Sequence, residues 1–135
     1  GTFVGTSRFL KEVSAGLVQC YSVEPDSPFH GLEGMKHMES ALVPAIYDSS
    51  IADKALVAPT EESFELMRHV ARTQGLLIGP SCAAALFAAL ELAEDLKEGC
   101  IVVVFPDSGE RYLSEPHIWE QQDEAESIQL LRRKA

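Results

Sequence analysis

Two kinds of hydrophobic pattern alternate along the chain. In the first, apolar residues stand three or four positions apart or cover every side, which is typical of helices. In the second, short apolar and β-branched runs end at glycine, proline or acidic residues, which is typical of strands. The predicted helices are 2–13, 60–74 and 83–96, and the predicted strands are 17–23, 55–58, 76–78 and 100–105. This alternation predicts an α/β fold with three layers, α/β/α, around a mainly parallel sheet.

Residues at the segment boundaries support these predictions. Thr60 is expected to cap the helix that it opens, because its hydroxyl can accept a hydrogen bond from a free N–H group of the first turn. Gly75 suits the position just after that helix, where a left-handed backbone is common. The run CIVVVF at 100–105 is apolar without alternation, so we expect a strand that is covered on both faces.

Two segments do not fit either pattern. Residues 25–50 are interrupted by prolines and glycines and predict an irregular loop, and a loop of this length is usually functional or mobile. Residues 119–135 are mostly polar, which predicts a surface helix or a frayed tail. We therefore expect one α/β domain over 1–118 and a polar helical tail over 119–135.

The composition narrows the class of protein. The chain has 135 residues, of which 46% are hydrophobic, and this suits one folded domain. Its net charge of −10 opposes binding to nucleic-acid phosphates. No apolar stretch reaches about 18 residues and no signal-peptide pattern is present, so we expect no membrane segment. The scattered Cys20, Cys82 and Cys100 are expected to be reduced and buried, which favours a cytoplasmic location.

Candidate chemistry follows the predicted strands, because α/β sheets bind ligands at the carboxyl ends of their strands. Ser81 follows 76–78, and residues 107–109 follow the last strand. Gly1 and Thr2 open the first helix, whose free N–H groups suit a phosphate. From the residues alone, the simpler interpretations are preferred: Ser81 as a plain N-cap and 107–109 as a plain turn. The four histidines lack metal-ligand spacing, so no metal site is predicted.

Five stretches occur in one order and at characteristic distances, and they are GTFVGTSRFLKE, VEP, GMKHMESALVPAIYD, QGLLIGPSCAAA and VVVFPDSGERYLS. Together they resemble the C-terminal part of the cysteine synthase and cystathionine β-synthase family, over residues 1–116. Members of this family are pyridoxal-phosphate enzymes of the tryptophan-synthase-β fold type, also called fold type II. The resemblance implies part of the large domain of such an enzyme, with pyridoxal 5′-phosphate as its cofactor.

The resemblance also implies roles for residues around the cofactor. The family's serine that matches Ser81 hydrogen-bonds the pyridine nitrogen, and Gly1 and Thr2 match the end of the phosphate loop. A neutral hydroxyl does not demand a protonated ring, which favours β-elimination over transamination. Cys82 and Ala83 replace the Ser-Gly or Ala-Gly that usually follows this serine. Ala83 thereby adds a methyl group where the backbone passes close to the ring.

Two further features concern catalysis and the substrate. The family's Schiff-base lysine has no counterpart here, so no catalytic residue is assigned and the chain alone is expected to be inactive. The loop around Lys36 resembles a branch of the family that carries a basic residue there, and some members of that branch take sulfur from a small carrier protein. Lys36 is therefore a candidate for binding an anionic group of the substrate, and a solvated loop lysine is an equal alternative.

The reaction that the resemblance implies is β-replacement on O-acetylserine or O-phosphoserine, a step of cysteine biosynthesis. The implied partners are a small amino-acid substrate, a second copy in a homodimer and a sulfur-carrier protein. Two alternatives stay open: a non-catalytic half-protein that binds a partner, and a portion of a threonine synthase or dehydratase relative. A sheet that lacks some of its strands is also expected to expose an apolar edge.

Overall fold

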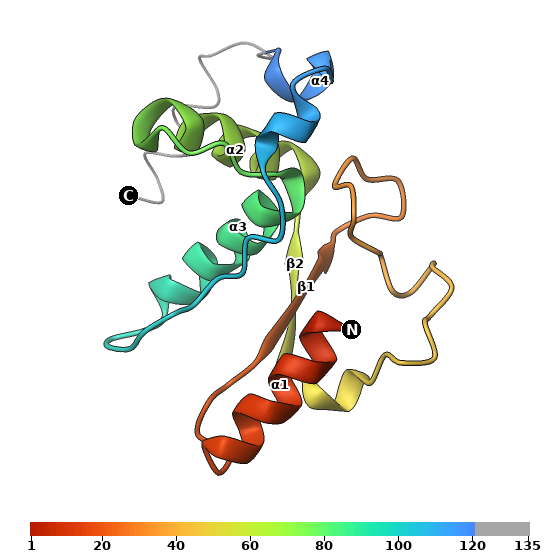
Figure 1. Ribbon diagram of the computed structural model, residues 1–135, viewed down its shortest axis with the longest axis vertical. Coiled ribbons are helices and arrows are strands. Elements are labelled where there is room, and N and C mark those ends of the chain that lie inside the picture. Colours follow the sequence, from red (N-terminus) through yellow and green to blue (C-terminus); the bar gives the residue numbers. More distant parts are fainter. Residues whose placement is uncertain (121–135) are drawn as a thin grey trace.

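Residues 1–120 are described by the computed structural model, and Figure 1 shows their arrangement. The elements in chain order are α1 (Thr2–Val13), β1 (Tyr21–Pro25), η1 (Ser49–Ile51), β2 (Lys54–Ala58), α2 (Thr60–Gln74), α3 (Pro80–Glu94), η2 (Gly109–Tyr112) and α4 (Pro116–Trp119). The predicted tail over 119–135 lies almost wholly outside the described residues. Within residues 1–120, no helix has the length and apolar character needed to cross a membrane.

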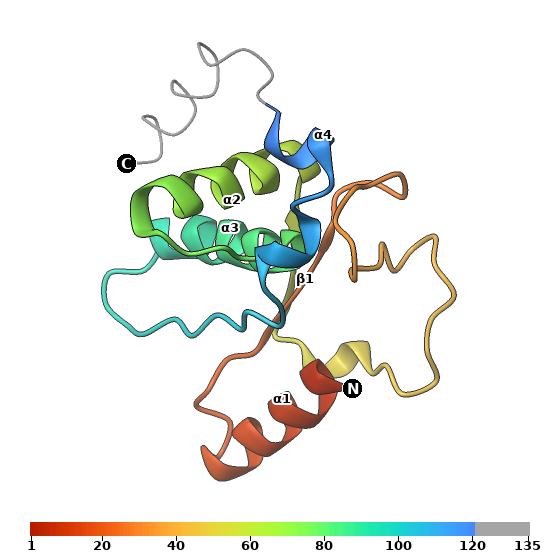
Figure 2. The ribbon, with the colours of Figure 1, turned by 45° about the horizontal axis from the view of Figure 1, so that its top comes forward.

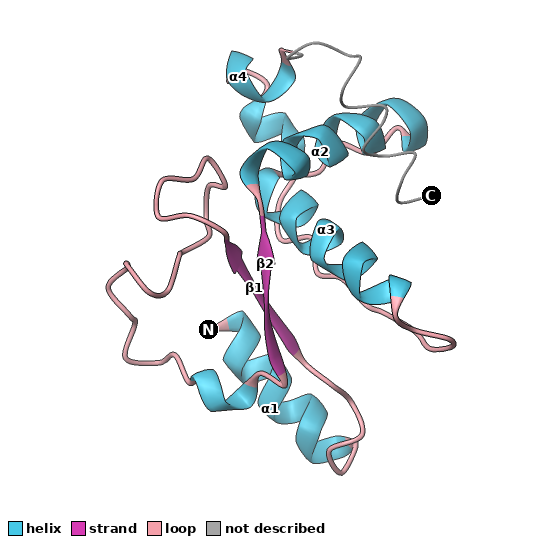
Figure 3. Ribbon diagram, turned by 180° about the vertical axis from the view of Figure 1, so that it is seen from behind, coloured by secondary structure: helices cyan, strands magenta, loops and turns pink. Residues whose placement is uncertain are grey.

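β1 and β2 form a two-stranded parallel sheet in the described part of the chain. Tyr21 pairs with Lys54, and the register continues to Pro25, which lies opposite Ala58. The chain between the two strands is the predicted long loop, which Figure 3 shows extending to one side of the strand pair. The α/β class and the parallel pairing are therefore confirmed.

Helices lie on both sides of the strand pair. Figure 2 shows α2 and α3 on one side and α1 on the other. α3 packs against both strands, and α2 packs against α3. Lys11, in the last turn of α1, donates to both carboxylate oxygens of Asp53 at 2.7 Å, and Asp53 also accepts the backbone N–H of Cys20 at 2.7 Å. These bonds join the end of α1 to the residues just before β1 and β2.

The core lies between α2, α3 and the strands. The helical spacing of apolar residues in α2 places Phe64, Met67 and Val70 on one buried face, whereas Ala71 beside them is partly buried. Small side chains on α3 allow its neighbours to pack closely against it, and the buried ones are Cys82, Ala83, Ala84 and Ala88. Leu32 reaches the same core from the long loop and is fully buried. The core thus holds one point of the loop in place.

Helix ends agree with the sequence patterns in part. α2 begins at Thr60, but its N-cap is Pro59, and Thr60 Oγ1 instead accepts the N–H of Gly31 at 3.4 Å. The prediction of Thr60 as an N-cap is wrong because its hydroxyl bonds to the long loop. Gly75 is confirmed after α2, with a left-handed φ of 66°. α3 begins at Pro80, earlier than predicted, since proline suits the first turn of a helix.

Two predicted strands are wrong and a third is shifted. Residues 100–105 pair with no strand of the described chain, and Val102 is 84% exposed. Of 76–78, only Ile78 forms a bridge, which is antiparallel to Ser108. β1 begins at Tyr21, later than predicted. An apolar run becomes a strand only beside a hydrogen-bonded neighbour. Residues 100–105 have none in the described chain, and most of their apolar side chains are exposed, so the prediction of a strand covered on both faces is wrong.

Candidate functional site

Ser81 lies in the first turn of α3, directly after the buried residues 78–80. The N-cap of α3 is Gly79, and no side chain caps this helix. The interpretation of Ser81 as an N-cap is therefore wrong. Its side chain is partly exposed, and within residues 1–120 its hydroxyl takes part in no hydrogen bond. The hydroxyl is thus available to a ligand at the N-terminal end of a helix.

Asp107 lies against the turn that carries Ser81. The Cys82 thiol is 3.3 Å from both Oδ1 and the backbone oxygen of Asp107 and is shared between them as a donor. Tyr112 donates its hydroxyl to Oδ2 at 2.6 Å. A Cβ added at Gly79 would lie 2.0 Å from Oδ1, so any larger residue there would require the carboxylate to move. We name Gly79, Cys82, Asp107 and Tyr112 the Asp107 cluster.

Backbone contacts fasten the next residues to the same place. Gly109 donates its N–H to the carbonyl of Leu77 at 3.0 Å. A Cβ at Gly109 would lie 2.7 Å from the carbonyl oxygen of Ile78, so this approach also depends on glycine. Residues 107–109, which the sequence alone presents as a plain turn, therefore lie in tight contact with the chain that leads into α3.

The sequence patterns do not reveal the Asp107 cluster. Asp107 is 25 positions from Cys82 and 5 from Tyr112, and neither separation belongs to a helix or strand period. The usable signal is the compact motif PDSGERY, which holds a carboxylate and a phenol close together. Burial raises the pKa of the Cys82 thiol, and the hydrogen bond to Asp107 raises the pKa of Tyr112 to about 12. Both side chains therefore stay protonated at neutral pH and act as donors.

The raised pKa of Tyr112 predicts that the chain loses stability in strong alkali. An unfolded tyrosine titrates near pH 10, whereas Tyr112 in the folded chain has a pKa of about 12. Its stabilisation is complete below pH 10 and is lost as the pH rises to 12. Tyr112→Phe is expected to lower the free energy of unfolding by about 1–2 kcal/mol at neutral pH and to reduce the alkaline decline.

Urea unfolding measured at a series of pH values checks this prediction. Tyr47→Phe, in the long loop, is the matched control and should retain the decline of the parent chain. An alkaline decline in Tyr112→Phe that equals that of the parent chain would contradict the expected role of the hydrogen bond.

Gly1 and Thr2 are exposed at the start of α1, where Gly1 is the N-cap. The Gly1 carbonyl accepts the N–H of Gly5 at 3.0 Å. The N–H groups of the residues before Gly5 have no partner within the helix, as in the first turn of any helix. No hydrogen bond within residues 1–120 joins Gly1 or Thr2 to Ser81. The two predicted parts of the cofactor site are thus presented separately by α1 and α3.

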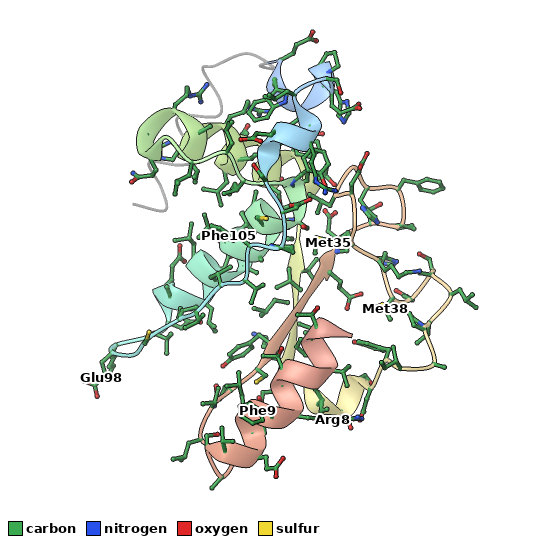
Figure 4. The ribbon with its side chains drawn as sticks, viewed as in Figure 1. Arg8, Phe9, Met35, Met38, Glu98 and Phe105 are labelled. Carbon is green, nitrogen blue, oxygen red and sulfur yellow. The ribbon has the colours of Figure 1, made fainter. Side chains whose placement is uncertain are left out.

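Lys36 is exposed on the long loop. The loop is held on both sides of it, because Met35 packs against the core and the backbone N–H of Met38 donates to Glu24 Oε2 at 2.9 Å. Figure 4 shows Met35 near the carboxyl ends of the strands and Met38 further out along the loop. Glu24 belongs to β1, so Lys36 stands close to the edge where α/β sheets bind ligands. This position agrees with both interpretations of Lys36.

The three cysteines are free, and two of them are buried as predicted. Cys100 is exposed, so the prediction of burial is wrong for this residue, because the segment that it opens has no neighbouring strand. In the part of the chain that the structure describes, no three His, Cys, Asp or Glu side chains gather closely enough to hold a metal ion.

The fold and the site define an α/β domain with a free hydroxyl at the start of α3 and open N–H groups at the start of α1, and these groups suit a small ligand that carries a phosphate. The family described as pyridoxal-phosphate dependent enzyme matches residues 1–107. The chain belongs to this family, whose cofactor is pyridoxal phosphate.

Two proteins with named activities are similar to this chain in sequence. The cysteine synthase of Aquifex aeolicus is 41% identical over 118 residues, which cover 84% of this chain and 36% of that protein. The O-acetylserine dependent cystathionine beta-synthase of Bacillus subtilis is 42% identical over 120 residues, which cover 84% of this chain and 39% of that protein. The chain therefore spans well under half of the length of these relatives.

Solved structures agree with the sequence comparison. The cysteine synthase of Entamoeba histolytica superposes with a TM-score of 0.84 at 29% identity, over 98% of this chain and 41% of that chain. A hydrogen sulfide-producing enzyme of Fusobacterium nucleatum superposes with a TM-score of 0.75 at 38% identity, over 84% of this chain and 40% of that chain. The described fold is thus part of the fold of pyridoxal-phosphate enzymes of the cysteine synthase kind.

Proposed function

We propose that the chain is the C-terminal cofactor-domain portion of a cysteine synthase-like enzyme. Such an enzyme replaces the β-substituent of O-acetylserine or O-phosphoserine with sulfur. The observation that carries the proposal is Ser81, whose hydroxyl is partly exposed at the start of α3 and unbonded within residues 1–120. The names of the relatives, which are cysteine synthases and a cystathionine beta-synthase, support the same reaction class.

The residues present suit pyridoxal phosphate. The Ser81 hydroxyl would hydrogen-bond the ring nitrogen, and the open N–H groups at Gly1 and Thr2 would hold the phosphate. The bound cofactor supplies an electron sink for bonds broken at the α and β carbons of an amino acid. Because serine is neutral, it would hold the ring in place without stabilising a proton on the nitrogen. A neutral partner for the ring nitrogen favours elimination at the β carbon over transfer of the amino group.

The amine that anchors the cofactor in this family would come from outside this chain. Lys11 is bonded to Asp53, and Lys36, Lys54 and Lys97 are exposed. Turnover would therefore need the rest of the enzyme. We further propose that the complete enzyme is a cytoplasmic homodimer, in keeping with the free thiols.

Ser81→Ala tests the proposed cofactor contact. The probe is 4′-deoxypyridoxine 5′-phosphate, which keeps the ring nitrogen and the phosphate but lacks the aldehyde that reacts with surface lysines. Titration followed by phosphorus NMR is expected to show binding to the parent chain and binding about 5–10-fold weaker to Ser81→Ala, because one hydrogen bond is lost. Ser114→Ala is the control, and equal affinities of all three chains would exclude the contact.

Lys36 is proposed to attract the anionic group of the substrate, such as the phosphate of O-phosphoserine. In the complete enzyme, Lys36→Ala is expected to raise the KM for O-phosphoserine about 5–10-fold and to change the KM for O-acetylserine much less. Lys97→Ala is the control, because Lys97 is also exposed but lies beyond α3. Equal effects on the two substrates would support the alternative of a solvated lysine.

The rival function is a non-catalytic half-protein that binds a partner. The exposed apolar segment 100–105 favours it, because a segment with unpaired backbone groups can pair with a strand of a partner. Titration with pyridoxal phosphate tests whether the anchoring amine lies outside this chain. A Schiff-base absorbance that survives dialysis, with one lysine labelled after borohydride treatment, would show that the chain supplies its own amine. A portion of a threonine synthase or dehydratase is the weaker rival, because the relatives described above are of the cysteine synthase kind.

A further inference from the structure

We propose that Asp107 is a positioning residue for Ser81 and acts through Cys82 and Tyr112. The inference rests on the proposed contact between Ser81 and the cofactor ring. It assigns to the PDSGERY motif the task of fixing the direction in which the Ser81 hydroxyl points. No hydrogen bond within residues 1–120 joins Asp107 to Ser81, so the effect passes through the turn on which Ser81 stands.

Asp107 contacts the chain on both sides of Ser81. On one side, a Cβ at Gly79 would lie 2.0 Å from Oδ1, so the carboxylate rests on the N-cap of α3. On the other side, the Cys82 thiol lies 3.3 Å from the same oxygen. Gly79 and Cys82 are both buried. The short piece of backbone between them, which includes Ser81, therefore has fixed ends.

The second carboxylate oxygen fixes Asp107 itself. Oδ2 accepts the hydroxyl of Tyr112 at 2.6 Å, and Tyr112 is buried in the core. A single carboxylate thus joins α3 to η2 through its two oxygens. Cys82 and Tyr112 both donate hydrogen bonds to the Asp107 carboxylate. The carboxylate therefore does not need the Ser81 hydroxyl as a donor, and that hydroxyl stays available to a ligand.

Two measurements on the full 135-residue chain test the inference. The first is the set of NMR three-bond couplings that report the χ1 rotamer of Ser81. One rotamer is expected in the parent chain, and averaged couplings are expected in Asp107→Asn and in Tyr112→Phe. Ser63, which donates to the carbonyl of Pro59 at the N-cap of α2, should keep its couplings in both variants. Tyr47→Phe is the control for loss of a phenol hydroxyl.

The second measurement separates positioning from a general loss of structure. It compares 4′-deoxypyridoxine 5′-phosphate with its analogue in which carbon replaces the ring nitrogen. In Asp107→Asn, affinity for the nitrogen-bearing ring is expected to fall about 5-fold, with little change for the carbon analogue. A change shared equally by both rings, or unchanged Ser81 couplings, would overturn the inference.

The outcomes also distinguish this inference from the proposed function. If the parent chain binds neither ring, the proposed cofactor contact fails, and the Ser81 couplings alone then decide the positioning role. If Asp107→Asn does not fold, Cys82→Ala replaces it, because alanine fits the buried site and removes the contacts of the thiol to Oδ1 and to the backbone oxygen of Asp107. Averaged Ser81 couplings in Cys82→Ala would support the role, and couplings equal to those of the parent chain would overturn it.

Discussion

Replacing Gly79 with alanine is expected to lower the free energy of unfolding by about 3 kcal/mol. The added Cβ would lie 2.0 Å from Asp107 Oδ1 and 2.7 Å from its Cγ, so the carboxylate would have to move. Backbone strain does not contribute to this loss of stability, because the Gly79 φ of −77° is open to any residue. Chemical denaturation of the parent chain and of Gly79→Ala measures the effect.

A double-mutant cycle isolates the contact with Asp107. In an Asp107→Ala background, Gly79→Ala is expected to cost less than about 1 kcal/mol, since the obstructing carboxylate is gone. Gly5→Ala in α1 is the matched control, because no atom lies within 4 Å of its added Cβ. That control is expected to be neutral or stabilising by up to about 1 kcal/mol. The same cost for Gly79→Ala in both backgrounds would contradict this account.

Leu32→Ala is expected to lower the free energy of unfolding by about 2–4 kcal/mol. Leu32 is fully buried although it lies in the long loop, and it packs in the same cluster as Phe64 and Met67. Its loss would leave a cavity beneath the loop and release the segment that carries Lys36. Urea denaturation measures the stability, and amide hydrogen exchange measures how far the loop opens.

Phe29→Ala provides the comparison for Leu32. Phe29 is in the same loop, is larger and is 96% exposed. Its truncation is expected to change stability by less than about 0.5 kcal/mol. Equal losses for the two variants would mean that the buried contacts of Leu32 do not hold the loop.

Local patterns predict the three long helices of residues 1–120 well, whereas they do not predict the short α4. The bounds of α1, the inner face of α2 and the left-handed Gly75 all follow from short-range effects that a sequence displays directly. The position of Ser81 at the start of a helix whose first turn is buried also follows from such effects. Its freedom from an N-cap role does not, because that depends on Gly79 having taken the cap position.

Features that depend on distant partners could not be predicted in the same way. Residues 100–105 have the composition of a strand, yet pairing requires a neighbour that the described chain does not provide. The bond from Gly31 to Thr60 and the Asp107 cluster join segments that only the fold brings together. The local sequence around Asp107 does not show that its two carboxylate oxygens accept hydrogen bonds from two different elements, α3 and η2.

The long loop between β1 and β2 has a consequence for the order in which the chain folds. Tyr21 can meet Lys54 only after the intervening chain has closed, and the entropy of that closure is lost before any strand pairing compensates for it. α1, α2 and α3 depend on near neighbours, so we expect them to form early. The bond of Lys11 to Asp53 and the burial of Leu32 divide the closure of the long loop into smaller loop closures. Each smaller closure costs less entropy, so the strands can meet sooner. The step that sets the folding rate is therefore expected to be the joining of the two strands.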